Sequence, residues 1–276
     1  MNKNTFKRYL NKKVYYKIRR EYYLRKLYFV KPKVILLGNQ KSGTSAIAIL
    51  LSEYTKLSST IDIPAFWPLE ADLHSGKISL NGFIKKFPWY FTNKIVKEPC
   101  LTFLYGELFN SFPNTKYVFI VRHPLDNIRS ILDRVNINPT YLPFDTKDVI
   151  HLTINKTWKR ILRGDLIEDF KANEITSILA YRWCKAVDIY FKNKKNIFLV
   201  KYEDFLKDKE ESIKSIAEYF ELPKKQDIKY LKDVQFQPRG KNRDINIKIL
   251  FSPLILYKVK KICFDRMNKL GYSIEI

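Results

Sequence analysis

The chain has few cysteines, few acidic residues and no long apolar run. Cys100, Cys184 and Cys263 form no close pair and no C-x-x-C spacing, which argues against a disulfide framework or a zinc site and favours a reducing compartment. No stretch reaches the roughly 20 apolar residues that a membrane-spanning helix needs. The first 33 residues also lack the apolar core of a secretory signal. The sequence therefore predicts a soluble, cytoplasmic protein.

The shortage of acids leaves a large positive charge. The 276 residues include 51 Lys+Arg and 28 Asp+Glu, so the net charge is 51 − 28 = +23. Such a charge favours anionic partners, namely nucleotides, acidic glycans, membrane surfaces or nucleic acid, without selecting among them. With 46% hydrophobic and 15% aromatic residues, the chain can bury a large core, and one large domain over residues 31–276 is expected.

Residues 1–30 are expected to form a separate basic helix. Apolar side chains recur every four residues over 4–28, with lysines and arginines around them, at Phe6, Leu10, Val14, Ile18 and Tyr22. The first interpretation of this stripe is that it packs on the core. Peripheral contact with a membrane surface and contact with nucleic acid are the alternatives.

The rest of the chain alternates between strand and helix patterns. Apolar runs predict strands at 34–37, 94–97, 116–121 and 196–200. Helical patterns are expected at about 44–54, 102–111, 174–192, 209–220 and 253–269, with one more beginning at Pro124. The segments 57–93, 135–172 and 223–247 lack clear periodicity. This alternation predicts an α/β fold, a central parallel β-sheet flanked by helices on both faces.

A loop after the first predicted strand has the features of an anion site. Gly38 and Gly43 lie five residues apart between a strand and a helix, where backbone N–H groups and the positive helix end converge. The hydroxyl-bearing residues that add donors are Ser42, Thr44 and Ser45. In the nucleoside triphosphatase loop a lysine follows the second glycine, but here that position is Thr44, and Lys41 lies inside the loop.

The strand at 116–121 ends in a cation. Arg122 stands where a nucleoside triphosphatase would place a metal-binding acid, so the sequence predicts no metal and a second anion near the strand ends. The guanidinium offers a fork of donors suited to phosphate. Ser130 would lie about two helical turns further on and could reach the same anion.

These residues resemble the sulfotransferases that use 3′-phosphoadenosine 5′-phosphosulfate (PAPS) as donor, over most of residues 33–272. The stretch Gln40-Lys41-Ser42-Gly43-Thr44-Ser45 resembles the 5′-phosphosulfate loop of that family. By this resemblance Lys41 contacts the 5′-phosphate and the bridging oxygen. The stretch from Tyr117 to Ser130 resembles the 3′-phosphate motif, in which Arg122 and Ser130 bind the 3′-phosphate. The implied fold is the three-layer P-loop sulfotransferase sandwich.

Further short segments carry weaker likenesses to the same family. Tyr202 lies in a stretch that resembles the Tyr-Glu-Asp strand end, and Leu270-Gly271-Tyr272 resembles the C-terminal ending. The basic glycine loop that closes over the nucleotide is matched by Pro238-Arg239-Gly240-Lys241. The resemblance therefore adds Tyr202, Arg239, Gly240 and Lys241 to the expected donor contacts.

Sulfuryl transfer is an in-line displacement that needs positive charge on the leaving oxygen and a base for the acceptor. Lys41 is the first choice for the leaving oxygen, and Lys97 resembles an active-site lysine of the polysaccharide-type enzymes. Asp62 stands near the position of the glutamate base in glycan sulfotransferases, 21 residues after Lys41. The other candidates for the base are Glu70, Glu98, His74 and His151.

The predicted function is transfer of a sulfuryl group from PAPS to a hydroxyl, less favourably an amine, of a saccharide or other metabolite. The coproduct would be 3′-phosphoadenosine 5′-phosphate (PAP). One alternative is a P-loop kinase acting on a small molecule. The other is a non-catalytic basic module that binds nucleic acid or a membrane, although the sequence has no zinc-finger spacing and no RNP-type motif. Neither the identity of the acceptor nor the oligomeric state follows from the sequence.

Overall fold

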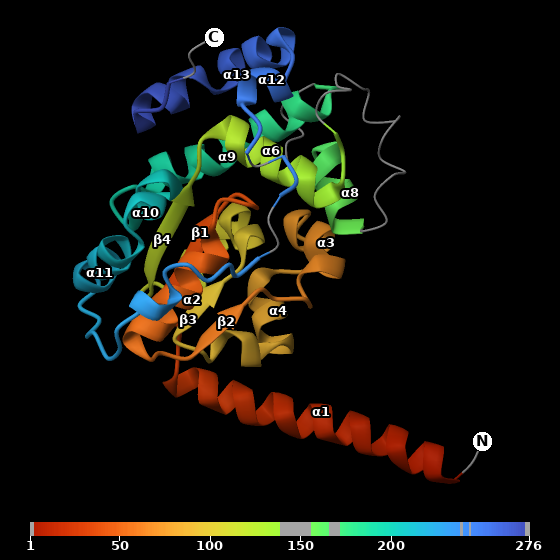
Figure 1. Ribbon diagram of the computed structural model, residues 1–276. Helices are drawn as coiled ribbons and strands as arrows, with labels where there is room; N and C mark the ends of the chain where they lie inside the picture. The colour runs from red at the N-terminus through yellow and green to blue at the C-terminus, as the bar shows by residue number, and fades with distance from the viewer. Residues whose placement is uncertain (1–2, 139–155, 166–171, 238–239, 243, 274–276) are drawn as a thin grey trace.

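A five-stranded parallel sheet in the order β2-β3-β1-β4-β5 forms the centre of the molecule (Figure 1). The computed structural model describes residues 3–138, 156–165, 172–237, 240–242 and 244–273. The strands are β1 (Val34–Gly38), β2 (Ser59–Ile61), β3 (Ile95–Lys97), β4 (Lys116–Val121) and β5 (Ile197–Lys201). The predicted α/β fold with a central parallel sheet is confirmed.

Both faces of the sheet are buried, which explains why its central strands are almost continuously apolar. Along β1, Val34 and Leu36 face one hydrophobic cluster, whereas Ile35 and Leu37 face the other. The first cluster is covered by α2 (Thr44–Thr55), α10 (Tyr202–Lys207) and α11 (Lys209–Tyr219).

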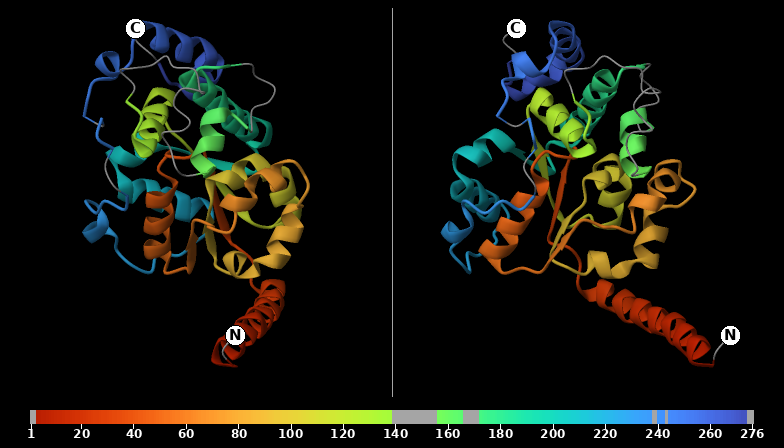
Figure 2. Two further views of the ribbon diagram at one scale, coloured as in Figure 1. Left: turned by 90° about the vertical axis from the view of Figure 1, so that its right-hand side faces the viewer. Right: turned by 45° about the vertical axis from the view of Figure 1, so that its right-hand side comes forward.

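The second cluster is covered by a thicker helical layer, and Figure 2 shows the two layers on either side of the sheet. The main helices of this layer are α4 (Leu80–Lys86), α5 (Tyr105–Ser111), α6 (Pro124–Val135), α9 (Ile175–Asn193) and α13 (Pro253–Leu270). The predicted three-layer arrangement is therefore confirmed.

The segments that were expected to be irregular contain short elements. Between residues 57 and 93 lie β2, α4, α3 (Glu70–His74) and the 3₁₀ helices η1 (Trp67–Leu69) and η2 (Pro88–Phe91). Among the described strands β2 pairs with β3 alone, and it spans three residues, which is too short to show a two-residue period. Residues 99–104 form a 3₁₀ helix, η3 (Pro99–Leu104), before α5 begins, where one helix was expected over 102–111.

Two other segments differ from the expectation in the same way. The predicted irregular stretch 135–172 contains α8 (Lys156–Arg163), while its residues 139–155 and 166–171 lie outside the described part of the chain. The stretch 223–247 contains η6 (Lys229–Leu231) and the start of α12 (Ile247–Leu250). These elements are only one or two turns long, so they carry too few residues for a helical period to stand out.

The N-terminal helix α1 (Lys3–Phe29) projects from the body of the molecule (Figure 1). Val14, Ile18 and Tyr22 are 50%, 65% and 59% exposed, so the expectation that this stripe packs on the core is wrong for these residues. Periodicity shows that a stripe exists but not which surface, if any, covers it. No helix among the described residues is both long enough and apolar enough to cross a membrane.

Gly38, at the end of β1, should not tolerate a side chain. Its φ is +147°, and a Cβ there would lie 2.5 Å from the Ile120 carbonyl oxygen of β4. We expect Gly38→Ala to lower the free energy of unfolding, measured in urea, by about 2 kcal/mol or more. Gly106→Ala in α5 is the matched control, because its Cβ meets nothing within 4 Å and alanine favours a helix by roughly 0.5–1 kcal/mol. Equal stabilities of the two variants would contradict this reading of the strand end.

Candidate active site

Each of the five strands ends at or just before a residue singled out from the sequence. Lys41 follows β1, Asp62 follows β2, Lys97 ends β3, Arg122 follows β4 and Tyr202 follows β5. The carboxyl ends of parallel strands meet at one edge of a sheet, which is where open α/β sheets bind ligands. The fold therefore gathers the candidate donor and acceptor residues at a single edge.

The loop after β1 is shaped by buried amide side chains. Asn127 of α6 donates from Nδ2 to the Gln40 carbonyl oxygen at 2.8 Å and to Ser42 Oγ at 3.2 Å. Its Oδ1 accepts a hydrogen bond from Asn39 Nδ2 at 2.9 Å. Asn127 is completely buried, so these bonds form away from water and hold the loop in one conformation.

The side chain of Gln40 is committed to the interior. Its Oε1 accepts from Arg182 Nη2 at 2.9 Å and from Arg182 Nε at 3.2 Å, and its Nε2 lies 3.1 Å from Cys100 Sγ. Arg182 of α9 is 1% exposed and stands 4.3 Å from the ring centroid of Phe103. Burial lowers the pKa of Arg182, and the negative charge of Glu70 opposes that shift. Gln40 thus supports the loop through its side chain.

The hydroxyl residues of the loop are buried, and one of them contacts Gln237. Ser42, Thr44 and Ser45 are all buried. Gln237 Nε2 donates to Ser45 Oγ at 2.9 Å, and Gln237 Oε1 accepts from Lys41 Nζ at 3.2 Å. In this structure Gln237 therefore bridges the lysine and a hydroxyl that were expected to contact an anion.

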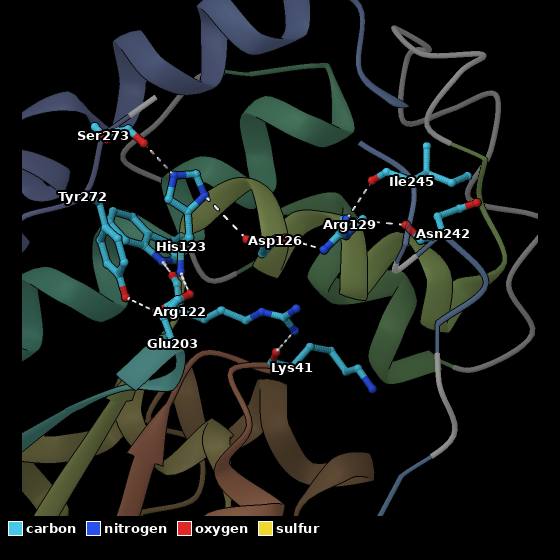
Figure 3. A network of polar contacts seen from close by, with 11 residues as sticks. Lys41, Arg122, His123, Asp126, Arg129, Glu203, Asn242, Ile245, Tyr272 and Ser273 are labelled. Carbon is cyan, nitrogen blue, oxygen red and sulfur yellow. Dashed lines mark hydrogen bonds and ion pairs between the residues drawn. The ribbon is translucent and has the colours of Figure 1, made fainter. Parts of the chain in front are cut away.

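Arg122 lies directly against the loop. Its Nη1 donates to the Lys41 carbonyl oxygen at 3.3 Å, and its guanidinium carbon is 4.9 Å from the ring centroid of Tyr202. The same Tyr202 ring covers Gly43, whose φ is +92° and whose Cβ, if present, would lie 2.2 Å from the ring. Figure 3 shows the Lys41 and Arg122 side chains extending in the same direction from the loop. The cationic side chains of Lys41 and Arg122, which follow adjacent strands, thus extend into the same region of the sheet edge.

Positive charge is concentrated around Lys41. Burial lowers the pKa of Lys41, and the charges of Arg134, Arg122 and Lys97 lower it further, while the charge of Asp133 opposes them. Burial also lowers the pKa of Arg122. A bound anion would offset this repulsion, so the sheet edge has the electrostatics of an anion site.

A hydrogen-bond network ties the C-terminal segment to the end of β4 (Figure 3). Glu203 accepts from the backbone N–H of His123 at 2.8 Å and from the Tyr272 hydroxyl at 2.7 Å. His123 Nε2 lies 3.2 Å from the Ser273 carbonyl oxygen. Burial, followed by the Glu203 carboxylate, raises the pKa of Tyr272. These contacts hold the backbone immediately after Arg122.

The described residues of the late basic loop, Gly240 and Lys241, lie against α6, the helix that carries the half-buried Ser130. Gly240 packs so closely that a Cβ would meet Asp133 Oδ2 at 2.1 Å, and Lys241 Nζ donates to Asn136 Oδ1 at 3.3 Å. Arg239 lies outside the described residues. One turn earlier, Arg129 pairs with Asp126 and donates to the Ile245 carbonyl oxygen at 3.1 Å.

Asp62 and Lys97, from adjacent strands, form an ion pair. Asp62 has a φ of +66° and its side chain is 36% exposed, whereas that of Lys97 is 5% exposed. Glu98, the next residue, accepts from the backbone N–H groups of Ile63 at 3.0 Å and Cys100 at 3.1 Å. Burial raises the pKa of Glu98. Glu98 therefore holds the turn that carries Asp62.

The remaining candidates for the base lie deeper. Glu70 is 2% exposed. His74 lies between the rings of Phe66 and Phe103, each with its centroid 6.3 Å away. Burial, then the charge of Arg182, lowers the pKa of His74 to about 4. His151 lies outside the described residues.

Four residues that support this site received no role from the sequence, namely Asn127, Arg182, Glu203 and Gln237. Arg182 left a signal, because it is a single arginine within the apolar stretch Ile178 to Val187. Asn127 and Glu203 lay inside recognised motifs but were given no partner. Within the described ranges, no three His, Cys, Asp or Glu side chains gather closely enough to hold a metal ion.

The arrangement of the sheet and helices is that of sulfotransferases of known structure. A sulfotransferase from Alicyclobacillus acidocaldarius is similar with a TM-score of 0.52 and 11% identity, over 89% of this chain and 98% of that one. Mouse sulfotransferase SULT7A1 complexed with PAP is similar with a TM-score of 0.51 and 16% identity, over 87% of this chain and 86% of that one. At these identities the likeness shows the fold.

Sequence comparison then gives the family. The model of the sulfotransferase family matches residues 71–227, which is more than half of the 276 residues. The chain therefore belongs to the sulfotransferase family. A search of curated proteins by sequence gave no match.

Removing the Lys41 charge should stabilise the free protein. The pKa of Lys41 is lowered by folding, so its charge costs stability at neutral pH, and this cost disappears as the pH rises through the folded-state pKa. We expect Lys41→Met to raise the free energy of unfolding at pH 7 by roughly 0.5–1 kcal/mol, with a smaller gain at about pH 10, near the ordinary lysine pKa.

Lys56→Met is the matched control for Lys41→Met. Lys56 also has a left-handed backbone, with φ 54°, but it pairs with Glu53 at 2.7 Å. Removing its charge should change stability by less than about 0.5 kcal/mol. A Lys41 variant less stable than the wild type at pH 7 would show that the cations at the sheet edge are compensated in the free protein.

Proposed function

We propose that this sulfotransferase transfers a sulfuryl group from PAPS to a hydroxyl of a saccharide or other metabolite, with an amine as the less favoured acceptor. The observation that carries the proposal is the convergence of Lys41 and Arg122 from adjacent strands, joined by the bond from Arg122 Nη1 to the Lys41 carbonyl oxygen at 3.3 Å. Two cations side by side suit a donor with phosphate at two positions. The similar mouse enzyme is complexed with PAP.

The residues present fit such a donor. Burial, and then the charges of Arg134, Arg122 and Lys97, lower the pKa of Lys41, which a bound anion would offset, and the loop after β1 offers backbone donors ahead of α2. Lys41 and the backbone of Ser42 to Ser45 would hold the 5′-phosphosulfate end, while Arg122 and Ser130 would hold the 3′-phosphate. PAPS, when bound, supplies the activated sulfuryl group.

The chain itself supplies charge, position and a base. The Lys41 and Lys97 ammonium groups would each hold a proton toward oxygens that gain negative charge. Asp62 would take the proton of the acceptor hydroxyl at a carboxylate oxygen, oriented by its ion pair with Lys97.

Asp62 is preferred as the base because it is the accessible acid at this edge. Its side chain is 36% exposed, whereas both oxygens of Glu98 accept backbone hydrogen bonds. Glu70 is 2% exposed and His74 lies among aromatic rings.

A saccharide acceptor is supported by the surroundings of Asp62. The backbone turns from Ile63 to Phe66 through a 2.8 Å hydrogen bond, and the next residue, Trp67, is 39% exposed. An exposed indole offers an apolar face to a sugar ring, and the net charge of +23 favours acidic glycans.

We also infer that the enzyme works in the cytoplasm, because all three cysteines are buried free thiols, as suits a reducing compartment.

Arg122 should discriminate between nucleotides. We expect Arg122→Gln to weaken PAP binding by about 10–100-fold, the loss of a charged hydrogen bond, and adenosine 5′-phosphate binding by less than about threefold, because only PAP has the 3′-phosphate. Isothermal titration of both nucleotides measures this, with the exposed Arg163→Gln as control. Equal losses for the two nucleotides would refute the role of Arg122. Thermal stabilisation of the wild type by ATP–Mg²⁺ alone would refute PAPS as the donor.

Asp62 should act on turnover and leave donor binding intact. We expect Asp62→Asn to lower kcat by about 10²–10⁴-fold, the usual contribution of a general base, with the affinity for PAP unchanged. Turnover of PAPS with a panel of acidic saccharides measures kcat, and Asp72→Asn in α3 is the control. Full activity of Asp62→Asn together with an inactive Glu70→Gln or His74→Gln would move the base to that residue.

A further inference from the structure

The helix α1 carries strong charge of one sign and an uncovered apolar surface. Residues 3–29 include ten Lys/Arg and one acid, Glu21. Ile18 and Tyr22 are 65% and 59% exposed, and Phe29 is 81% exposed. Successive residues turn by about 100°, so Val14, Ile18 and Tyr22 form a continuous stripe along the helix.

Contacts with the body fix the direction that this stripe faces. The Arg19 guanidinium carbon lies 4.7 Å from the ring centroid of Trp89, and the Tyr23 ring lies 6.4 Å from it. Arg20 Nε donates to the Lys85 carbonyl oxygen at 3.0 Å. The last turns of α1 are thus held on η2 and α4, with the stripe of Val14, Ile18 and Tyr22 turned to solvent.

We propose that α1 binds the surface of an anionic lipid bilayer. The apolar stripe would insert at the level of the acyl boundary, and lysine and arginine side chains would reach the phosphate headgroups. Lys17 and Arg25 are exposed alongside the stripe and suit this role.

Charge and composition favour a bilayer over other occupants. A second copy of α1 would bring ten like charges against ten, which opposes self-association. Nucleic acid would satisfy the cations but would leave Ile18, Val14 and Phe29 uncovered, because these side chains gain nothing from phosphate. An anionic bilayer satisfies both properties of the helix at once.

Such binding would leave the active site open. The helix α1 leads into the start of β1 and lies beyond the amino ends of the strands (Figure 1), while Lys41 and Arg122 follow the carboxyl ends of β1 and β4. The bilayer would therefore lie at the amino ends of the strands and the acceptor at their carboxyl ends. Lipid binding should not block turnover of a soluble acceptor, and the proposal does not depend on which acceptor is used.

Vesicle sedimentation of the full-length protein tests the proposal. We expect binding to vesicles of phosphatidylglycerol and phosphatidylcholine, with at least about tenfold weaker binding to phosphatidylcholine alone. The double variant Ile18→Ser/Tyr22→Ser should lose at least about tenfold in partitioning. The matched control is Leu254→Ser/Tyr257→Ser on α13, whose residues are 50% and 56% exposed, and it should bind as the wild type does.

A second pair of variants tests the charge. Lys17→Gln/Arg25→Gln should weaken binding to the anionic vesicles by about tenfold or more, whereas Lys261→Gln/Lys269→Gln on α13 should not. Unchanged melting temperatures would show that these surface variants fold. Equal binding to both kinds of vesicle, or unimpaired binding by Ile18→Ser/Tyr22→Ser, would overturn the proposal. The proposal would also be overturned if the Ile18→Ser/Tyr22→Ser variant lost dimer formation or duplex DNA binding shown by the wild type while it still bound vesicles.

Discussion

The partial burial of like charges at the carboxyl edge of the sheet is the constraint around which the site is built. Lys41, Arg122 and Lys97 come from three neighbouring strands, and the pKa of Lys41 is lowered first by burial and then by the nearby cations. The sheet can impose this because its strands are buried on both faces and cannot shift independently. Asn127 and Arg182 form hydrogen bonds with Gln40 in the loop after β1. These buried contacts stabilise the loop and offset the free-energy cost of the clustered charge, so the loop keeps its conformation.

The acids near the cations form hydrogen bonds or ion pairs with other groups. Glu203 lies in the network around Arg122, and its two oxygens accept from the His123 N–H and the Tyr272 hydroxyl. The two carboxylate oxygens of Glu98 likewise accept hydrogen bonds from two backbone N–H groups. Asp62 is the exception, because it pairs directly with Lys97. The region around Lys41 and Arg122 thus keeps its positive potential, and the neighbouring part of the edge keeps a partly exposed carboxylate in Asp62.

The carboxyl and amino ends of the parallel strands carry different parts of the molecule. The carboxyl ends of the strands carry the candidate active-site residues, while the amino ends carry α1, whose outward stripe no described residue covers. A parallel sheet separates the two by the length of its strands, so a surface that binds at one edge does not obstruct the other. This separation keeps the basic helix α1 apart from the cation cluster at the carboxyl ends of the strands.

The α/β alternation, the loop at residues 38–45 and the cation Arg122 could all be predicted from the amino-acid sequence, because each is encoded by residues close together in the chain. Apolar runs and glycine spacing are local signals. The pairing of Asp62 with Lys97, 35 residues away, and the support of Gln40 by Arg182, 142 residues away, became visible only in the folded molecule. The folded molecule also shows that the stripe of α1 faces solvent. The strand β2, which brings Asp62 to the sheet, is three residues long, and pairing with β3 stabilises it where its own sequence shows no pattern.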